Sequence, residues 1–307
     1  MASQKIVFLI LPEVHLLDLG GPEQVFLEAI GYGAPFEIEY CTYTKELRSS
    51  GGLTFGHIKH FSEVAIKPED YIFIPGPNVR SIHDYKFTSQ TELLDWLRRC
   101  HRENITLCSV CSGAFALAYA GLLDYKKCTT HFKRTAELKR YFPKLDVQEN
   151  VLFVEDGNII TSAGIASGID MALYILERIQ GSHFAHKVAR EMVIYTRRTG
   201  SQPQKSSYLD YRNHIHSGIH KVQDYLSENI HKKSSVGHLA EIACMSERNF
   251  TRIFKKEAGI TVNEYTTLVR KEKIKLLLKN PDLSRVQIAR AVGLNSDRQL
   301  SRIMHSI

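Results

Sequence analysis

The sequence lacks any apolar run near the roughly 20 residues that a membrane-spanning helix needs. The opening MASQKIVFLILPEV holds a short apolar run, but an acidic residue follows it and no small-residue cleavage site is evident. With 307 residues, 43% hydrophobic and 24% charged, the composition excludes disorder and suggests two domains. We therefore expect a cytoplasmic protein with no membrane partner.

The cysteines lack the spacings of a disulfide framework or a CxxC pair. A disulfide scaffold is therefore excluded as the organising principle, and reduced core thiols are the simplest interpretation. The six cysteines are Cys41, Cys100, Cys108, Cys111, Cys128 and Cys244.

The net charge of +7 is not spread evenly along the chain. Residues 1–204 carry 22 Lys and Arg against 23 Asp and Glu, whereas residues 205–307 carry 18 against 10. A basic module after a neutral one indicates a polyanionic partner, although a solvated basic face remains the alternative.

Strand and helix signals alternate over the first two hundred residues, which predicts a mostly parallel α/β sheet. The polar stretch TGSQPQKSS at 199–207 reads as a linker, and the rest of the chain reads as helical. Strands are predicted at 5–11, 36–42, 71–74 and 105–110, a hairpin at 151–154 and 158–161, and helices at 21–29 (with Pro22 near its first turn), 91–103, 113–120 and 169–180.

Two similar segments in the basic third predict a duplicated helix-turn-helix. SVGHLAEIACMSERNFTRIF at 235–254 reads as a helix capped by Ser235, a turn at Cys244, and a basic helix capped by Ser246. LSRVQIARAVGLNSDRQLSRIM at 283–304 repeats this pattern, with Asn295 or Ser296 as the cap. A long helix at 262–278 separates the two units, and the duplication favours DNA binding more strongly than one copy would.

The runs LAEIACMSERNFTRIFKKEAGIT and IARAVGLNSDRQLSR resemble the DNA-binding domain of AraC/XylS-family transcription regulators. The resemblance implies that each unit places one helix in successive major grooves, where Arg and Gln suit guanine and adenine edges. That family normally continues with a Gly-x-x-Pro-x-x-Tyr-like segment and a closing helix, so we expect the second unit to be truncated at Ile307. The DNA-binding residues implied are Arg248, Thr251, Arg252, Arg298, Gln299 and Arg302 as base-reading candidates, with Lys255 and Lys256 as phosphate contacts.

The segment ITLCSVCSGAFALAYAG at 105–121 resembles a nucleophile elbow, a strand leading through Cys111 into a helix. A thiol near a helix N-terminus is favoured as the thiolate. With His131 in TTHF and Asp18 in LLDLGGPEQVF it could form a nucleophilic set, although buried cysteines and core histidines are common.

SVCSGAFALAYAGLLD, TTHF and ITSAGIASGIDMALYILE resemble the PfpI-type branch of the class I glutamine amidotransferase-like superfamily, over about residues 4–195. In isonitrile hydratase relatives the cysteine and the acid matching Asp18 are catalytic, and a threonine commonly follows the cysteine where this chain has Ser112. We expect a ligand pocket or vestigial nucleophile at Asp18, Cys111, Ser112 and His131, with the backbone of Gly76 and residues 163–165 contributing.

Three histidines beside the linker, His214, His216 and His220, could suggest a metal. Their spacing does not place all three on one helical face, so no metal site is predicted.

The sequence thus predicts a flavodoxin-like α/β domain at 1–198, a linker at 199–212, and an all-α domain with two helix-turn-helix units at 213–307. The predicted function is a DNA-binding transcription regulator modulated by a small molecule. The alternative is a cysteine-dependent hydrolase or hydratase with an appended DNA-binding domain. We expect double-stranded DNA, an unknown effector, RNA polymerase and a second copy of the chain as partners, with no cofactor and no catalytic residue.

Overall fold

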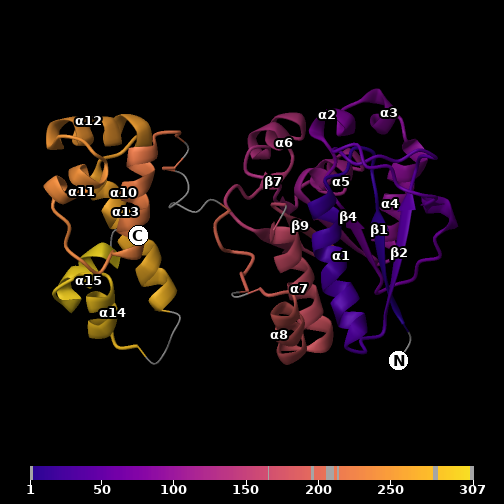
Figure 1. Cartoon of the computed structure of the whole chain (residues 1–307). Helices are drawn as coiled ribbons and strands as arrows, with labels where there is room; N and C mark the ends of the chain where they lie inside the picture. The colour runs from indigo at the N-terminus through magenta and orange to yellow at the C-terminus, as the bar shows by residue number, and fades with distance from the viewer. Residues whose placement is uncertain are drawn as a thin grey trace. The chain divides into compact units, whose positions relative to one another are not determined.

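The computed structural model describes residues 3–164, 166–194, 197–204, 211–212, 214–278 and 283–304. Contacts within the chain divide it into two compact units, Met1–Gln204 and Lys205–Ile307. Each unit is described by itself below (Figure 1). No helix of the described residues is long and apolar enough to cross a bilayer. The predicted domain limits at residues 198, 199–212 and 213 stay a prediction, since part of the linker lies outside the described residues.

The first unit is built on a seven-stranded sheet in the order β3-β2-β1-β4-β5-β9-β8. All neighbouring strands pair in parallel except β8 and β9, which form the predicted antiparallel hairpin. A separate parallel pair joins β6 to β7. The strands are β1 (Gln4–Leu9), β2 (Phe36–Thr42), β3 (Lys59–His60), β4 (Tyr71–Ile74), β5 (Thr106–Val110), β6 (Lys127–Cys128), β7 (Asp146–Val147), β8 (Phe153–Asp156) and β9 (Ile159–Ser162).

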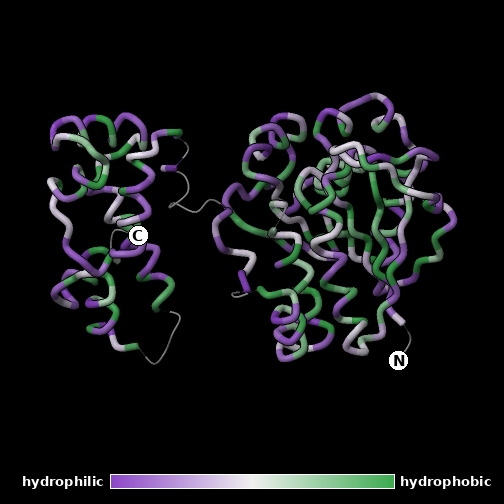
Figure 2. The backbone as a smooth tube through the Cα atoms, in the orientation of Figure 1, coloured by the Kyte–Doolittle hydropathy of each residue, from purple (hydrophilic) through white to green (hydrophobic). Residues whose placement is uncertain are grey.

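Helices cover both faces of this sheet, so the central strands are buried on both sides and read as continuous apolar runs (Figure 2). One face packs against α1, α7 and α8, and the other packs against α4 and α5. This confirms the predicted mostly parallel α/β domain. The helices are α1 (Leu16–Gly31), α2 (Val79–Ile82), α3 (Tyr85–Thr88), α4 (Thr91–Arg102), α5 (Ala114–Tyr119), α6 (Thr135–Tyr141), α7 (Ala166–Gln180) and α8 (Ser182–Glu191), with 3₁₀ turns η1 (Phe61–Glu63) and η2 (Cys111–Gly113).

The first helix begins earlier than the sequence predicted. The prediction placed its start at residue 21 with Pro22 in the first turn, but α1 begins at Leu16 and Pro22 lies inside it. Proline is usually excluded there because it removes one helical hydrogen bond. The longer helix matters for function, because it brings Asp18 into its first turn, at the carboxyl end of the sheet.

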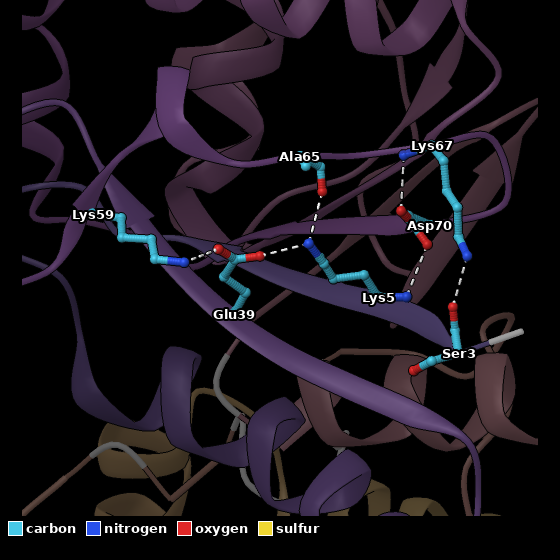
Figure 3. A network of polar contacts seen from close by, with 7 residues as sticks. All are labelled: Ser3, Lys5, Glu39, Lys59, Ala65, Lys67 and Asp70. Atoms are coloured by element: carbon cyan, nitrogen blue, oxygen red, sulfur yellow. Dashed lines mark hydrogen bonds and ion pairs between the residues drawn. The ribbon is translucent and has the colours of Figure 1, made fainter.

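A polar network stabilises the opposite end of the sheet, where strand β1 begins (Figure 3). The buried carboxylate of Asp70 accepts the backbone N–H groups of Lys5 and Lys67 at 2.8 and 2.9 Å. Glu39 on β2 accepts from the Nζ atoms of Lys5 and Lys59, each at 2.7 Å. These contacts join β1, β2, β3 and the turn before β4. The candidate site lies at the other end of the strands, where β4 and β5 end.

The second unit is helical, and it contains both predicted helix-turn-helix units. Side chains of Ser235 and Ser284 accept the N3 backbone N–H groups of α11 and α14, while Thr261 forms a capping box with Glu264 at the start of α13. Cys244, exposed and at φ 57°, lies in the turn between α11 and α12. The helices are α10 (Ser217–Glu228), α11 (Val236–Ile242), α12 (Glu247–Ala258), α13 (Val262–Leu277), α14 (Arg285–Ala291) and α15 (Asp297–Met304).

Two apolar clusters hold these helices. Phe250 and Phe254 of α12 pack with Tyr265 of α13 in the core of the first helix-turn-helix, all three fully buried. Ile274 of α13 and Leu300 of α15 belong to the second cluster. Helix α13 therefore contributes to both cores and sets the spacing of the two helix-turn-helix units, as the sequence predicted.

Candidate functional site

Cys111 lies at the carboxyl end of β5, where the strand turns through η2 into α5. Its φ of 56° is in the left-handed region, which is unusual for a residue other than glycine. The turn is possible because Gly113 follows: a Cβ there would lie 2.1 Å from the carbonyl oxygen of Ile74 on β4. This strained strand-to-helix turn is the elbow that the sequence predicted.

Asp18 and Ser112 come together with Cys111 around the backbone of Gly76. A Cβ at Gly76 would lie 2.7 Å from both Asp18 Oδ2 and Ser112 Oγ, and 2.9 Å from Cys111 Cβ. The Ser112 hydroxyl donates to the carbonyl of Pro77 at 2.5 Å. Since β4 and β5 are neighbouring parallel strands, their carboxyl ends bring these loops to one place.

The proton of the Cys111 thiol is held more firmly than the sequence indicated. Burial, and secondly the charge of Asp18, raise the pKa of Cys111 to about 12. Helix α5 has only six residues, so its N-terminus offers little compensation. The expected thiolate is therefore corrected: the thiol of Cys111 keeps its proton at pH 7.

His131 lies beside this group and not within it. Its Nδ1 accepts the backbone N–H of Lys133 at 3.3 Å, and among the described residues no hydrogen bond joins His131 to Cys111. Burial, aided by the charges of Lys133 and Arg134, lowers the pKa of His131, so the ring is neutral at pH 7. A complete Cys–His–Asp relay is therefore not assembled, and the role of His131 stays a prediction.

Several groups at this edge of the sheet were not found from the sequence. Thr130 donates its hydroxyl to the carbonyl of Cys111 at 2.7 Å, and His15 donates its backbone N–H to Gly76 at 2.9 Å. Gly164, by contrast, is one of the predicted backbone contributors, and it packs against the cysteine so closely that a Cβ there would lie 2.2 Å from Cys111 Cβ. Only the TTHF and ITSAG strings hinted at these positions. Of the predicted backbone contributors 163–165, Ile165 lies outside the described residues.

A second candidate site is the basic face of the helical unit. The predicted residues on α12 and α15 project away from the two cores and are exposed, whereas Phe250, Phe254 and Leu300 on the same helices are buried. The exposed face of each helix takes no part in its core, so that face is available to enter a groove. The exposed predicted residues are Arg248, Thr251, Arg252, Lys255, Arg298, Gln299 and Arg302.

Some of these side chains already have local partners. Arg252 donates to Asn249 Oδ1 at 2.9 Å, which orients its guanidinium group along α12. Gln299 Oε1 accepts the backbone N–H of Asn295 at 2.8 Å. This hydrogen bond must break before Gln299 Oε1 can contact a base. Thr251 donates to the carbonyl of Glu247 at 2.8 Å. Their assignment as base-reading residues stays a prediction.

The histidine cluster has a structural explanation. The rings of His214 and His220 stack with centroids 4.3 Å apart, and burial lowers the pKa of His214. The N-cap of α10 is His216, whose Nδ1 accepts a backbone N–H. In the part of the chain that the structure describes, no three His, Cys, Asp or Glu side chains are grouped to hold a metal.

Comparison with known proteins finds a family model that matches the first unit and a domain model that matches the second. The model of the DJ-1/PfpI family matches residues 4–178, and a model described as a helix-turn-helix domain matches residues 239–307. Both matches agree with the sequence resemblances.

Among curated proteins, the chain is 28% identical over 210 residues to the HTH-type transcriptional regulator CdhR of Pseudomonas aeruginosa, covering 68% of this chain and 62% of that regulator's length. It is 31% identical over 195 residues to an isonitrile hydratase of Pseudomonas putida, covering 62% of this chain and 78% of the hydratase. A solved structure of an AraC family transcriptional regulator from Pseudomonas putida superimposes with a TM-score of 0.55 at 20% identity, over 62% of this chain and all (100%) of that one, which shows a shared fold.

Proposed function

Since the chain belongs to the DJ-1/PfpI family and carries a helix-turn-helix domain, we propose that it is a sequence-specific DNA-binding transcription regulator whose first unit responds to a small molecule. The observation that carries this proposal is the pair of exposed basic helices, α12 and α15, held at a fixed spacing by α13. The similarity to CdhR supports the same function. Double-stranded DNA is the partner, and the cytoplasm is the proposed location.

The charge distribution fits this role. The neutral first unit contributes no general attraction to phosphates, whereas the second unit carries 18 basic against 10 acidic residues. Association with DNA through such a unit releases counterions, so the affinity falls as salt rises, with a log–log slope of about −0.9 per neutralised phosphate. We propose a homodimer that acts through RNA polymerase, as the sequence-based interpretation expected.

Substitutions of Arg252 and of Lys255 distinguish a base-reading role from a phosphate contact. Replacing Arg252 by alanine is expected to cost about 1–3 kcal/mol at the preferred site and to relax discrimination at one base pair, with the salt slope nearly unchanged. Lys255→Ala should weaken all sequences alike and reduce the slope by about 1. Fluorescence anisotropy with a selected site and single-base variants, at several salt concentrations, measures both effects.

The control is Arg102→Ala on α4, which removes the same charge from an exposed position in the first unit. It should leave DNA affinity unchanged. If Arg252→Ala weakened every sequence equally, its role in base reading would be refuted.

The second candidate function is an enzyme, favoured by the contact of Asp18 with the Cys111 elbow and by the similarity to an isonitrile hydratase. Catalysis would need the thiol proton to move to Asp18, so that the sulfur attacks as the thiolate. The raised pKa of Cys111 opposes this step unless a bound molecule offsets it. We therefore propose that the elbow serves ligand sensing in this chain.

Cys111→Ala separates the two functions. For a sensor, ligand-free DNA affinity should stay within about twofold of the parent, because the substitution lies in the first unit and the DNA-binding helices belong to the second. Assays with isonitrile, amide and aldehyde substrates should show no cysteine-dependent turnover. Cys244→Ala, which removes the exposed thiol, is the matched control. Turnover on the order of 1 per second that vanishes in Cys111→Ala alone would establish the enzyme instead.

A further inference from the structure

A cavity of about 230 Å³ adjoins the elbow on the side of β9 and α7. Gly164 lines it and at the same time packs on Cys111, so one backbone layer separates the cavity from the sulfur. The volume is below the range of about 300–1,000 Å³ for drug-sized ligands and equals roughly seven or eight waters of about 30 Å³ each. A volume of this size suits a small metabolite.

Part of the cavity lining comes from the end of the first unit, residues 197–204, here named the exit segment. Arg198 and Gln204 of the exit segment both line the cavity. The sequence had assigned most of this stretch to a linker, because its polar composition carries no periodicity. The structure places it against the sheet, so any occupant of the cavity contacts the last described residues before the helical unit.

Three side chains and several backbone hydrogen bonds hold the exit segment. Arg198 Nη2 pairs with Asp170 of α7 at 2.5 Å, and that carboxylate side chain is only 5% exposed. Arg197 pairs with Glu177 of the same helix at 2.6 Å. The carbonyl of Gly200 accepts the backbone N–H of Leu152 at 2.8 Å. The segment is thus fastened to α7, whose N-terminus also lines the cavity.

Gln204 is the third side-chain anchor. Its Nε2 donates to the carbonyls of Thr130 and Glu149 at 3.0 and 3.2 Å, and to Thr129 Oγ1 at 3.2 Å. Its Oε1 is buried without a hydrogen-bond partner among the described residues. A buried acceptor left in this state is costly, so a turn of the Gln204 amide that brings Oε1 to an N–H or O–H donor of a ligand in the cavity would be favourable.

The remaining polar groups of the cavity favour an anionic group. Asp170 engages one nitrogen of the Arg198 guanidinium group, which has five N–H donors in all. Ala166 and Ser167 place the first turn of the 15-residue helix α7 at the cavity, and backbone N–H groups at such a terminus bind carboxylates. His131 is neutral here, and can donate or accept.

We propose that this cavity is the effector site, that it takes a small hydroxy- or amino-carboxylate, and that Arg198 and Gln204 bind it and report its presence through the exit segment. The inference rests on the proposed regulatory function. The carboxylate lies against Arg198 and the start of α7, and the ligand's N–H or O–H donates to Gln204 Oε1 once the amide has turned toward the cavity. An occupied cavity therefore holds both ends of the exit segment more firmly.

The test uses the full chain and two probes, glycolate and lactate, with glycolamide and lactamide as neutral matches. Isothermal titration is expected to show the acids binding at least about tenfold more tightly than the amides, as a charge-assisted hydrogen bond provides. The double variant Asp170→Asn, Arg198→Gln removes both charges together and should weaken acid binding about tenfold or more. Gln204→Met should weaken it about fivefold, and Gln202→Met, in the same segment but outside the cavity lining, should not.

Trypsin supplies an independent readout. Cleavage after Arg197 and Arg198 should slow at least about fivefold with saturating acid, whereas cleavage after the exposed Lys86 should not change. Equal binding of acids and amides, binding by neither acid, or acid binding that is unaffected by the Arg198 and Gln204 variants would overturn the inference. A parent chain that binds the acids as expected but binds no duplex DNA would refute the regulatory function and leave the carboxylate site standing.

Discussion

Replacing Gly164 by alanine is expected to destabilise the first unit by about 2–6 kcal/mol. The φ of 92° at this position costs an alanine about 1–3 kcal/mol, and forcing a methyl group into a filled space adds about 1–3 kcal/mol. The obstacle is the backbone and Cβ of Cys111, at 2.7 and 2.2 Å from the new methyl carbon, and neither can rotate away. Urea unfolding of the full chain measures this loss.

The matched control is Gly20→Ala in α1, where no heavy atom lies within 4 Å of a new Cβ. Because alanine favours a helix over glycine by about 1 kcal/mol, this variant should be neutral or slightly stabilised. A Gly164→Ala protein as stable as Gly20→Ala would show that the elbow yields easily, and the rigid-site argument would fail. The surviving folded fraction of Gly164→Ala should also lose its ligand response.

Phe254→Ala should abolish DNA binding at 37 °C while the first unit stays folded. Phe254 is fully buried, with its ring centroid 5.7 Å from those of both Phe250 and Tyr265. Truncating a buried phenylalanine costs about 3–5 kcal/mol, a large part of the roughly 5–15 kcal/mol that stabilises a typical domain. Since each kcal/mol lowers the Tm of a domain of this size by about 4–8 °C, calorimetry should show one transition displaced strongly.

Leu276→Ala on α13 provides the comparison, because that side chain is 52% exposed. Its cost should stay within about 0.5 kcal/mol, and DNA affinity should be retained. If Phe254→Ala bound DNA normally at 37 °C, α12 would not need this core to be positioned, and its assignment as a recognition helix would be contradicted.

Local patterns were sufficient to predict much of this fold. The strands at 36–42 and 71–74 agree with β2 and β4 to the residue. β4 is buried along its whole length and appears as an uninterrupted apolar run. β2 is only partly buried, and its apolar residues are interrupted by Glu37 and Glu39. Helix α11 of the second unit was found for a similar reason, since Ser235 marks its start. The elbow at Cys111 was also predicted, because a strand, a small-residue turn and a helix are all local.

Long-range features could not be predicted in the same way. Pro22 suggested a helix start, yet packing against α7 keeps α1 continuous through it. The thiolate expected at Cys111 depended on burial and on Asp18, which is far away in sequence. Arg198 and Gln204 gave no periodic signal, since their partners Asp170 and Thr130 belong to other elements. Each of these errors concerns a contact that only the tertiary structure provides.

The exposed turn at Cys244 has a practical consequence for handling this protein. The other five cysteines are buried, so a maleimide dye would mark the bend between α11 and α12 selectively, with no need to remove native cysteines. The same accessibility lets two copies become covalently joined during aerobic storage. Size measurements that address self-association therefore need a reducing agent, or an artefactual crosslink would be counted as a native dimer.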